Sequence, residues 1–245
     1  MQTLVEVKNL KKSYGLKEAV KGISFKIKDD EILGLLGPNG SGKTTTIGMM
    51  LGLLKPSNGE IIIDGKKIEE NRIEILKKIN FISPYIELPK KLTVKQNLIV
   101  YGKLYSVSDI KKRIEYLSEK LRLEDLLNKI TGELSSGQKN RVSLAKALIN
   151  EPKVLLLDEP TASLDPEIGD FVRTFLENYK KEKKISILLA SHNMNEVTRL
   201  CKSTLMMKDG IIIDSGSPEE LINKHGRQNL EEVFLKLTRS NNESN

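Results

Sequence analysis

The sequence predicts an α/β protein: a mixed, largely parallel sheet with helices, an antiparallel β layer and an inserted helical subdomain. Three observations support this prediction. Strand patterns dominate the N-terminal part of the chain, helical spacing dominates residues 84–143, and two continuous apolar runs at 154–157 and 185–190 have the length of buried parallel strands. A helical pattern at 166–180 separates these runs, so a strand–helix–strand unit is expected there.

The N-terminal part is expected to begin with antiparallel strands. Apolar residues recur within 4–10, and residues 23–27 alternate apolar and polar side chains at the period of a half-buried strand. A short apolar strand at 31–36 leads into a glycine-rich loop and a helix at 43–54. A further strand at 60–63 is predicted to turn at the Asp-Gly pair that follows it.

Helix-start signals mark the middle and the end of the chain. Thr93 and Gln96 have the spacing of a capping box, and a charged amphipathic helix is expected at 108–121. Strands at 203–207 and 211–214 are predicted to form a hairpin through an Asp-Gly turn. The run Ser-Pro-Glu-Glu at 217–220 then begins a helix, because it combines an N-cap, a proline in the first turn and a reciprocal glutamate.

The chain is expected to form one domain over residues 1–238. Its core is predicted at about 1–83 and 144–238, and the helical subdomain at about 84–143. A last amphipathic helix is expected at 229–238, and the polar residues 239–245 are predicted to be a disordered tail. The sequence contains no internal repeat.

Composition narrows the class of protein. With 38% hydrophobic and 30% charged residues and no apolar run long enough for a membrane span, the chain is typical of a soluble globular protein. The single cysteine, Cys201, and the lack of a signal-peptide pattern favour the cytoplasm. The net charge of +7 is interpreted as a solvated lysine-rich surface, because no basic stripe is interleaved with aromatic residues. No nucleic-acid partner is therefore expected.

The segment after the strand at 31–36 matches the phosphate-binding loop pattern in full and opens a helix, as that pattern requires. Glycines let the backbone wrap closely around phosphates, so that several N–H groups point at them from a helix N-terminus. The lysine is expected to bridge the β- and γ-phosphates, and the first threonine to ligate Mg²⁺. The loop residues are Gly37, Pro38, Asn39, Gly40, Ser41, Gly42, Lys43, Thr44 and Thr45.

Two carboxylates follow the predicted strand at 154–157. Asp158, at the strand tip, is the expected partner of Mg²⁺. Glu159, the next residue, is the expected general base that polarises the water attacking the γ-phosphate. Two such residues alone could be solvated carboxylates at a strand end, and the phosphate loop favours the catalytic interpretation.

A Ser/Gly segment lies between the phosphate loop and these carboxylates and opens a helix. Together with these motifs, the sequence resembles the ABC ATPase family over about residues 4–238. In that family the signature Leu-Ser-Gly-Gly-Gln lies at this place, where this sequence reads Leu-Ser-Ser-Gly-Gln. The resemblance implies that this signature segment contacts nucleotide. It comprises Ser135, Ser136, Gly137 and Gln138.

The resemblance extends to further positions. It implies that Tyr14 stacks on adenine, that His192 senses the γ-phosphate, and that residues 163–166 form a loop contacting the opposite subunit. Residues 230–235 resemble the ending of bacterial and archaeal subunits that serve ABC-2-like exporters. Each has a plainer alternative. Tyr14 could be a half-buried strand residue and His192 a surface residue. Residues 163–166 could be an ordinary helix start, and residues 230–235 a packing helix.

Two residues depart from the family pattern. Pro84 stands where the family has glutamine or glutamate, and proline offers neither a side-chain oxygen nor a backbone N–H. Ser136 replaces the first glycine of the signature pair. If that position needs a positive φ, serine would cost on the order of 1 kcal/mol; at a helix start it would be well tolerated. Both departures concern the hydrolysis rate rather than nucleotide binding.

The resemblance implies an ATP- and Mg²⁺-binding ATPase subunit that powers a transporter, in particular an exporter, from the inner face of the membrane. It also implies a separate membrane permease and an ATP-bound homodimer or heterodimer of ATPase subunits. Two alternatives stay open: a soluble ABC ATPase acting on DNA or ribosomes, and a regulatory nucleotide-binding subunit with weak catalysis. The transported molecule cannot be inferred, since the permease selects it.

Overall fold

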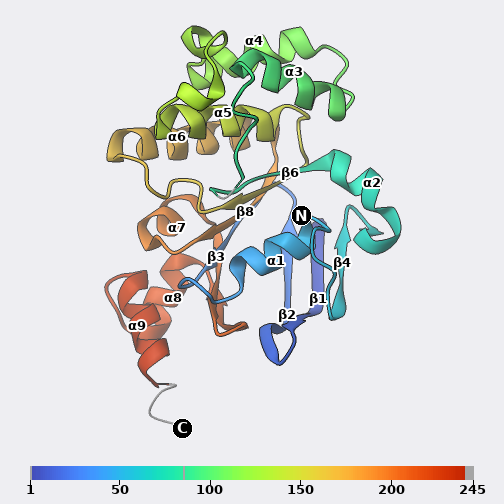
Figure 1. Ribbon diagram of the computed structural model, residues 1–245. Coiled ribbons are helices and arrows are strands. Elements are labelled where there is room, and N and C mark those ends of the chain that lie inside the picture. Colours follow the sequence, from blue (N-terminus) through green and yellow to red (C-terminus); the bar gives the residue numbers. More distant parts are fainter. Residues whose placement is uncertain (1, 85, 241–245) are drawn as a thin grey trace. The chain divides into compact units, whose positions relative to one another are not determined.

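Figure 1 shows the computed structural model, which describes residues 2–84 and 86–240. These residues group into two compact units. The first unit comprises the described residues of Met1–Ile75 and Ser186–Asn245, and the second comprises those of Leu76–Ile185. The helical segment predicted at 84–143 lies within the second unit, which also contains two strands and a long helix. Among the described helices, none has the length and apolar character needed to cross a membrane.

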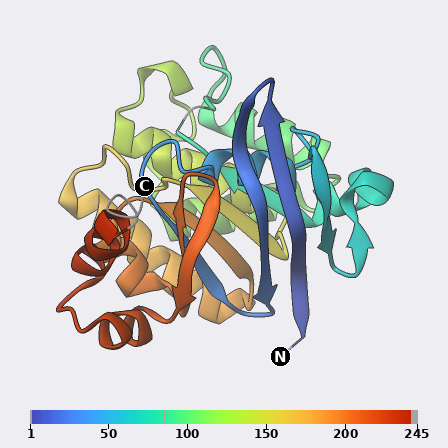
Figure 2. The same cartoon turned by 90° about the horizontal axis from the view of Figure 1, so that it is seen from below.

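The first unit contains an antiparallel sheet with the strand order β2-β1-β4-β5. A long hairpin of β1 (Thr3–Tyr14) and β2 (Lys17–Lys28) dominates it (Figure 2). Buried and exposed residues alternate along the second half of β2, as the predicted period requires. The strands β4 (Asn58–Ile63) and β5 (Lys66–Lys67) are joined by an Asp-Gly turn with two positive φ angles. The predicted antiparallel layer is therefore present.

A second sheet of the first unit contains the strand that precedes the phosphate loop. This strand, β3 (Ile32–Leu36), lies between β8 (Ser186–Ser191) and β9 (Ser203–Lys208) and runs parallel to both. All residues of β3 and β8 are buried, which explains the apolar run within each strand. The edge strand β10 (Ile211–Gly216) pairs antiparallel with β9, and thus confirms the predicted hairpin.

The helix after the phosphate loop, α1 (Lys43–Met50), ends earlier than predicted. Gly52 adopts a φ of 63°, and the N–H of Leu53 donates to the carbonyl of Gly48, which is the hydrogen bond of a Schellman C-cap. The helix was predicted to extend to residue 54, because Gly52 was not recognised as a stop signal.

Three further helices belong to the first unit: α7 (Met194–Leu200), α8 (Pro218–His225) and α9 (Leu230–Ser240). Ser217 caps α8 and forms the predicted capping box with Glu220. The helix α9 includes residues 239 and 240, which were predicted to begin the disordered tail. The remaining residues of that predicted tail, 241–245, lie outside the described residues.

The second unit holds a parallel strand pair, β6 (Ile79–Ile82) and β7 (Val154–Asp158). Sequence analysis predicted β7 but neither β6 nor the helix α2 (Ile68–Lys78) that leads into it. The charged character of residues 69–78 was interpreted only as a solvated surface. No glycine or proline separates α2 from the four-residue strand, so this boundary carried no sequence signal.

Four longer helices complete the second unit: α3 (Val94–Leu104), α4 (Ile110–Leu121), α5 (Ser136–Leu148) and α6 (Pro166–Lys183). The helices α3, α4 and α5 pack against one another (Figure 1). Thr93 and Gln96 form the predicted capping box of α3. Asp165 caps α6, with Pro166 as its first residue.

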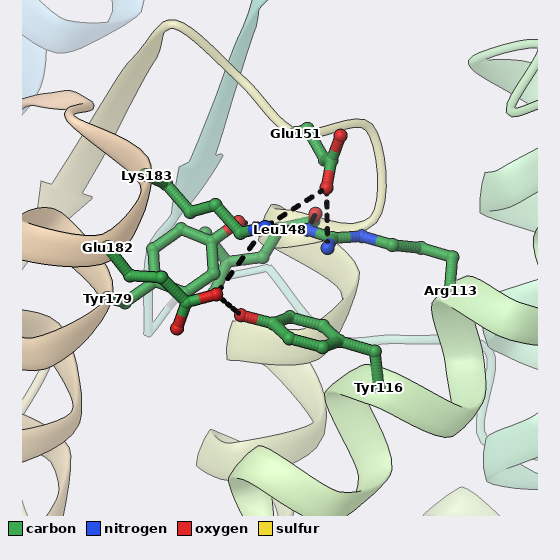
Figure 3. Close-up of polar contacts among 7 residues, drawn as sticks. All are labelled: Arg113, Tyr116, Leu148, Glu151, Tyr179, Glu182 and Lys183. Atoms are coloured by element: carbon green, nitrogen blue, oxygen red, sulfur yellow. Dashed lines mark hydrogen bonds and ion pairs between the residues drawn. The ribbon is translucent and has the colours of Figure 1, made fainter.

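Arg113 joins three of these helices (Figure 3). Its guanidinium lies at a buried position on α4 and donates to the carbonyl oxygen of Leu148 at 2.6 Å and to the hydroxyl of Tyr179 at 2.8 Å. It also forms a 2.8 Å ion pair with Glu151, whose carboxylate is largely exposed. The buried hydrogen bonds stabilise the arrangement more than the ion pair, because water screens the exposed carboxylate.

A second polar contact lies beside this guanidinium. The hydroxyl of Tyr116, on α4, donates to Glu182 of α6 at 2.8 Å, and Lys183 lies over the same aromatic ring (Figure 3). Burial, followed by the hydrogen bond to the Glu182 carboxylate, raises the pKa of Tyr116. The hydroxyl therefore stays protonated and keeps its role as a donor between α4 and α6.

Lys146, on α5, is a buried cation. It is 8% exposed, and its Nζ donates to the carbonyl oxygen of Phe81 at 3.1 Å. The ammonium also lies 4.5 Å from the ring centroid of Phe81 and 5.5 Å from that of Tyr101. No carboxylate of the described residues forms an ion pair with it. Burial lowers the pKa of Lys146 to about 8.

This buried lysine predicts a pH-dependent stability. Between the folded pKa of about 8 and the ordinary value of 10.5, the unfolded chain binds more protons at this position, so the folded state gains stability as the pH rises. Relative to Lys146→Met, the free energy of unfolding of the wild type should increase by about 2 kcal/mol between about pH 7 and about pH 9.5. Urea titrations at both pH values would measure this difference.

The matched control is Lys111→Met, which removes an exposed lysine from α4. Relative to the wild type, its free energy of unfolding should show little change between the two pH values. If the difference in the free energy of unfolding between the wild type and Lys146→Met were also the same at both pH values, Lys146 would not titrate in this range.

Candidate nucleotide-binding site

The glycine-rich loop lies between β3 and α1, as predicted. Gly40 and Gly42 adopt φ angles of 82° and 108°, and residues other than glycine rarely adopt such angles. A Cβ atom at Gly37 would lie 2.2 Å from the carbonyl oxygen of Met207, and one at Gly42 would lie 2.7 Å from that of Ala19. The close wrapping of this loop therefore requires glycine at these positions.

The lysine of the loop is held at its centre. Lys43 is buried, and its Nζ donates to the carbonyl oxygens of Gly37 at 2.7 Å and Pro38 at 3.2 Å. Among the residues that the structure describes, no side chain caps the N-terminus of α1. The positive end of that helix faces the loop, because the loop directly precedes it. A cation and helix N–H groups inside a glycine cradle fit the β- and γ-phosphates of a nucleotide.

The remaining loop residues differ in exposure. Asn39, Gly40 and Thr44 are exposed, Thr45 is half-exposed, and Ser41 is buried. The hydroxyl of Thr46, a buried residue outside the predicted set, donates to the carbonyl of Gly42 at 2.9 Å. Thr46 therefore supports the loop from the first turn of α1, whereas Thr44 is the accessible hydroxyl at its rim.

Two other predicted residues belong to the first unit. His192 directly follows β8, whose last residue, Ser191, is paired with Leu36 and accepts a hydrogen bond from the N–H of Gly37. The exposed His192 therefore lies at the sheet edge where the loop begins. Tyr14, 49% exposed, ends β1 opposite Lys17, close to the part of β2 that contacts Gly42. The structure thus brings both residues to the surroundings of the loop.

The two predicted carboxylates lie in the second unit. Asp158 is the last residue of β7 and is 1% exposed. Glu159 has a φ of 51°, an uncommon left-handed conformation for a residue with a side chain. Such conformations persist where the surrounding structure holds them and are frequent at functional sites.

The signature segment forms the start of α5. Ser135 is the N-cap, and its hydroxyl and the Gln138 side chain make a capping box. Ser136 is the first helical residue and has no positive φ, so the possible strain of serine at this position is absent. A Cβ at Gly137 would lie 3.2 Å from a side-chain carbon of Ile168, so a larger residue there would require that side chain to shift slightly.

A cavity of about 200 Å³ lies within the second unit. Its lining includes Glu159 and Pro84, so the residue that departs from the family pattern borders the same space as the predicted base. Asn140 of α5 also lines it. Asn140 was not among the predicted site residues, because the sequence does not indicate which residue a polar side chain of a helix contacts in the folded chain.

The predicted site residues thus form two groups. The phosphate loop, Tyr14 and His192 lie in the first unit, whereas Asp158, Glu159 and the signature segment lie in the second. Within each unit, residues distant in the sequence converge on one site: His192 at the start of the phosphate loop, and the Pro84 segment, the base of α5 and Glu159 around the cavity.

Comparisons with known proteins agree with these features. A family profile described as ABC transporter matches residues 20–162. The chain is 37% identical to the ABC transporter ATP-binding protein NatA of Bacillus subtilis (strain 168), over 91% of this chain and 92% of that protein. It is also 37% identical to the Nod factor export ATP-binding protein I of Rhizobium sp. (strain N33), over 94% of this chain and 76% of that protein.

Solved structures give the same result. An ATP-binding subunit of an ABC transporter matches with a TM-score of 0.88 and 28% identity, over 96% of this chain and 100% of that chain. A dimeric post-hydrolysis state of the ATP-binding cassette MJ0796, bound to ADP and Pi, matches with a TM-score of 0.80 and 28% identity, over 87% of this chain and 98% of that chain.

The chain belongs to the ABC transporter family. It is an ATP-binding subunit of that family, with the ATPase activity that the phosphate loop and the carboxylates predicted. The predicted family, fold class and enzyme class are thereby confirmed.

Proposed function

We propose that this ATPase powers an export-type transporter together with a separate integral membrane permease. The phosphate loop with its buried lysine carries the ATP-binding part of the proposal, since it supplies a cradle for the nucleotide phosphates. The Nod factor export protein, similar along most of its length, supports the export direction. A position at the inner face of the cell membrane follows from the proposed partnership.

Each predicted residue has a distinct role in the proposed reaction. Lys43 binds the β- and γ-phosphates, and Thr44 and Asp158 are the residues that would hold Mg²⁺. Mg²⁺, when bound, would neutralise charge that develops on the transferred phosphoryl group. Glu159 accepts a proton from the attacking water, His192 contacts the γ-phosphate, and Tyr14 stacks on the adenine.

The signature segment is proposed to act on nucleotide held by a second subunit. Its serine hydroxyl and the N-terminus of α5 would face the γ-phosphate, where negative charge is stabilised. Each chain then contributes two half-sites, and ATP joins two copies of this chain or this chain and a related partner. The dimeric cassette with ADP and Pi supports such an arrangement.

Pro84 favours a second candidate: a nucleotide-binding subunit with slow hydrolysis. It borders the cavity that Glu159 lines but offers no side-chain oxygen to orient water. The two candidates differ in turnover. A motor subunit should hydrolyse ATP faster when the permease is bound, whereas a regulatory subunit should stay slow in the same complex.

The test is to co-purify the chain with the membrane protein encoded by the neighbouring gene and to reconstitute the complex in lipid vesicles. ATP turnover should rise by about tenfold or more over that of the isolated chain, because small displacements of catalytic groups have large effects on the rate. Lys43→Ala in the same complex is the matched control and should abolish the increase. Stimulation by ribosomes or DNA instead of the permease would favour the non-transport alternative.

A further inference from the structure

Asn140 joins the helix of the signature segment to the backbone beside the proposed base. Its Nδ2 donates a 2.7 Å hydrogen bond to the carbonyl oxygen of Pro160, the residue that follows Glu159. Asn140 and Glu159 line the same cavity of the second unit. A side chain of α5 is therefore hydrogen-bonded to the residue next to Glu159.

The segment that receives this hydrogen bond is strained. Glu159 has a φ of 51° and Ser163 a φ of 62°, both unusual for residues with side chains. A local turn, closed by the N–H of Ala162 on the carbonyl of Glu159, cannot by itself define where the segment lies. The hydrogen bond from Asn140 comes from a separate element and ties the segment to α5.

The second observation concerns the oxygen of the Asn140 amide. Its Oδ1 is buried and accepts no hydrogen bond from the described residues. A buried oxygen without a donor destabilises the fold, and a leucine of similar shape would avoid this cost. The contribution of this side chain therefore comes from its donor end, which contacts Pro160.

We propose that Asn140 is a positioning residue for ATP hydrolysis. It acts through Pro160, by holding the left-handed turn in which Glu159 faces the attacking water, and it contacts no reacting atom itself. Because Ser135 caps the same helix, a movement of the signature segment would be transmitted to the base through this hydrogen bond. The proposal rests on the assignment of Glu159 as the general base.

Two variants of the full chain test the proposal. Asn140→Leu removes the amide, and Asn140→Asp keeps its shape but at neutral pH cannot donate to the carbonyl of Pro160. Both should lower kcat at saturating ATP by about tenfold or more, since small displacements of a catalytic group have effects of this size. The KM for ATP should stay within about threefold of the wild-type value, because nucleotide binding does not involve Asn140.

Asn150→Leu is the matched control. Asn150, just beyond the C-terminal end of α5, also donates from its amide to a backbone carbonyl, that of Lys77 at 3.0 Å, but it does not line the cavity that contains Glu159. This variant should lose thermal stability and keep the wild-type kcat. An equal loss of kcat in Asn150→Leu would mean general destabilisation and would overturn the proposal.

Glu159→Gln, measured in parallel, separates the two assignments. If Glu159→Gln loses turnover while both Asn140 variants keep it, the role of Asn140 is wrong and the base assignment stands. If Glu159→Gln keeps wild-type turnover, the base assignment fails and the role proposed for Asn140 fails with it.

Discussion

Lys43→Ala is expected to weaken ATP binding by about 100-fold or more. The Lys43 ammonium is the buried cation at the centre of the glycine loop, and hydrogen bonds from an ionised group to phosphate oxygens are worth about 1.5–3 kcal/mol each. The loss should be larger for ATP than for AMP, which has neither of the phosphates that Lys43 is proposed to bind. Isothermal titration calorimetry with both nucleotides would measure the two affinities.

A structural side effect of this substitution must be separated from lost binding. Lys43 also donates to the carbonyls of Gly37 and Pro38, so its removal could alter the loop itself. Lys111→Ala, which removes an exposed lysine of α4, provides the matched control and should bind ATP within about threefold of the wild type. Near-normal ATP affinity of Lys43→Ala would contradict the phosphate-loop assignment.

Glu159→Gln is expected to reduce ATP turnover by about 100- to 10,000-fold, the usual range for loss of a general base. Glutamine keeps the shape of the side chain but cannot accept the proton of the attacking water. ATP should still bind, because Lys43 and the loop are unchanged. A dimer formed around ATP would then persist, since hydrolysis is the step proposed to release it.

The mass of this variant in solution tests that expectation. With ATP, Glu159→Gln should be a dimer. With ADP it should be a monomer, because the γ-phosphate that the signature segment is proposed to contact is missing. Adding Ser135→Arg should also abolish the dimer, because it places a bulky cation at the N-terminus of α5. A monomer under all three conditions would exclude the homodimer and leave only a heterodimer with a related subunit.

The elements that local signals could reveal were predicted well. The Asp-Gly pairs that turn with two positive φ angles and the capping boxes at Thr93 and Ser217 depend on residues within four positions of one another. The sequence alone therefore predicts them. The strand β6 was not predicted, because it depends on a partner that is distant in the sequence. Its four residues form a strand only because β7, far away in the sequence, offers a parallel partner.

The sequence by itself determined the family, the phosphate loop and the order of the catalytic motifs, because each of these depends on residue types at fixed spacing. Tertiary structure alone decided how the departures from the family pattern are accommodated. Ser136 is unstrained because the helix α5 begins there, and Pro84 borders the cavity of Glu159 because the chain after β6 passes beside α5. The hydrogen bond from Asn140 to Pro160 likewise exists only in the folded chain, since it joins residues whose proximity no local pattern specifies.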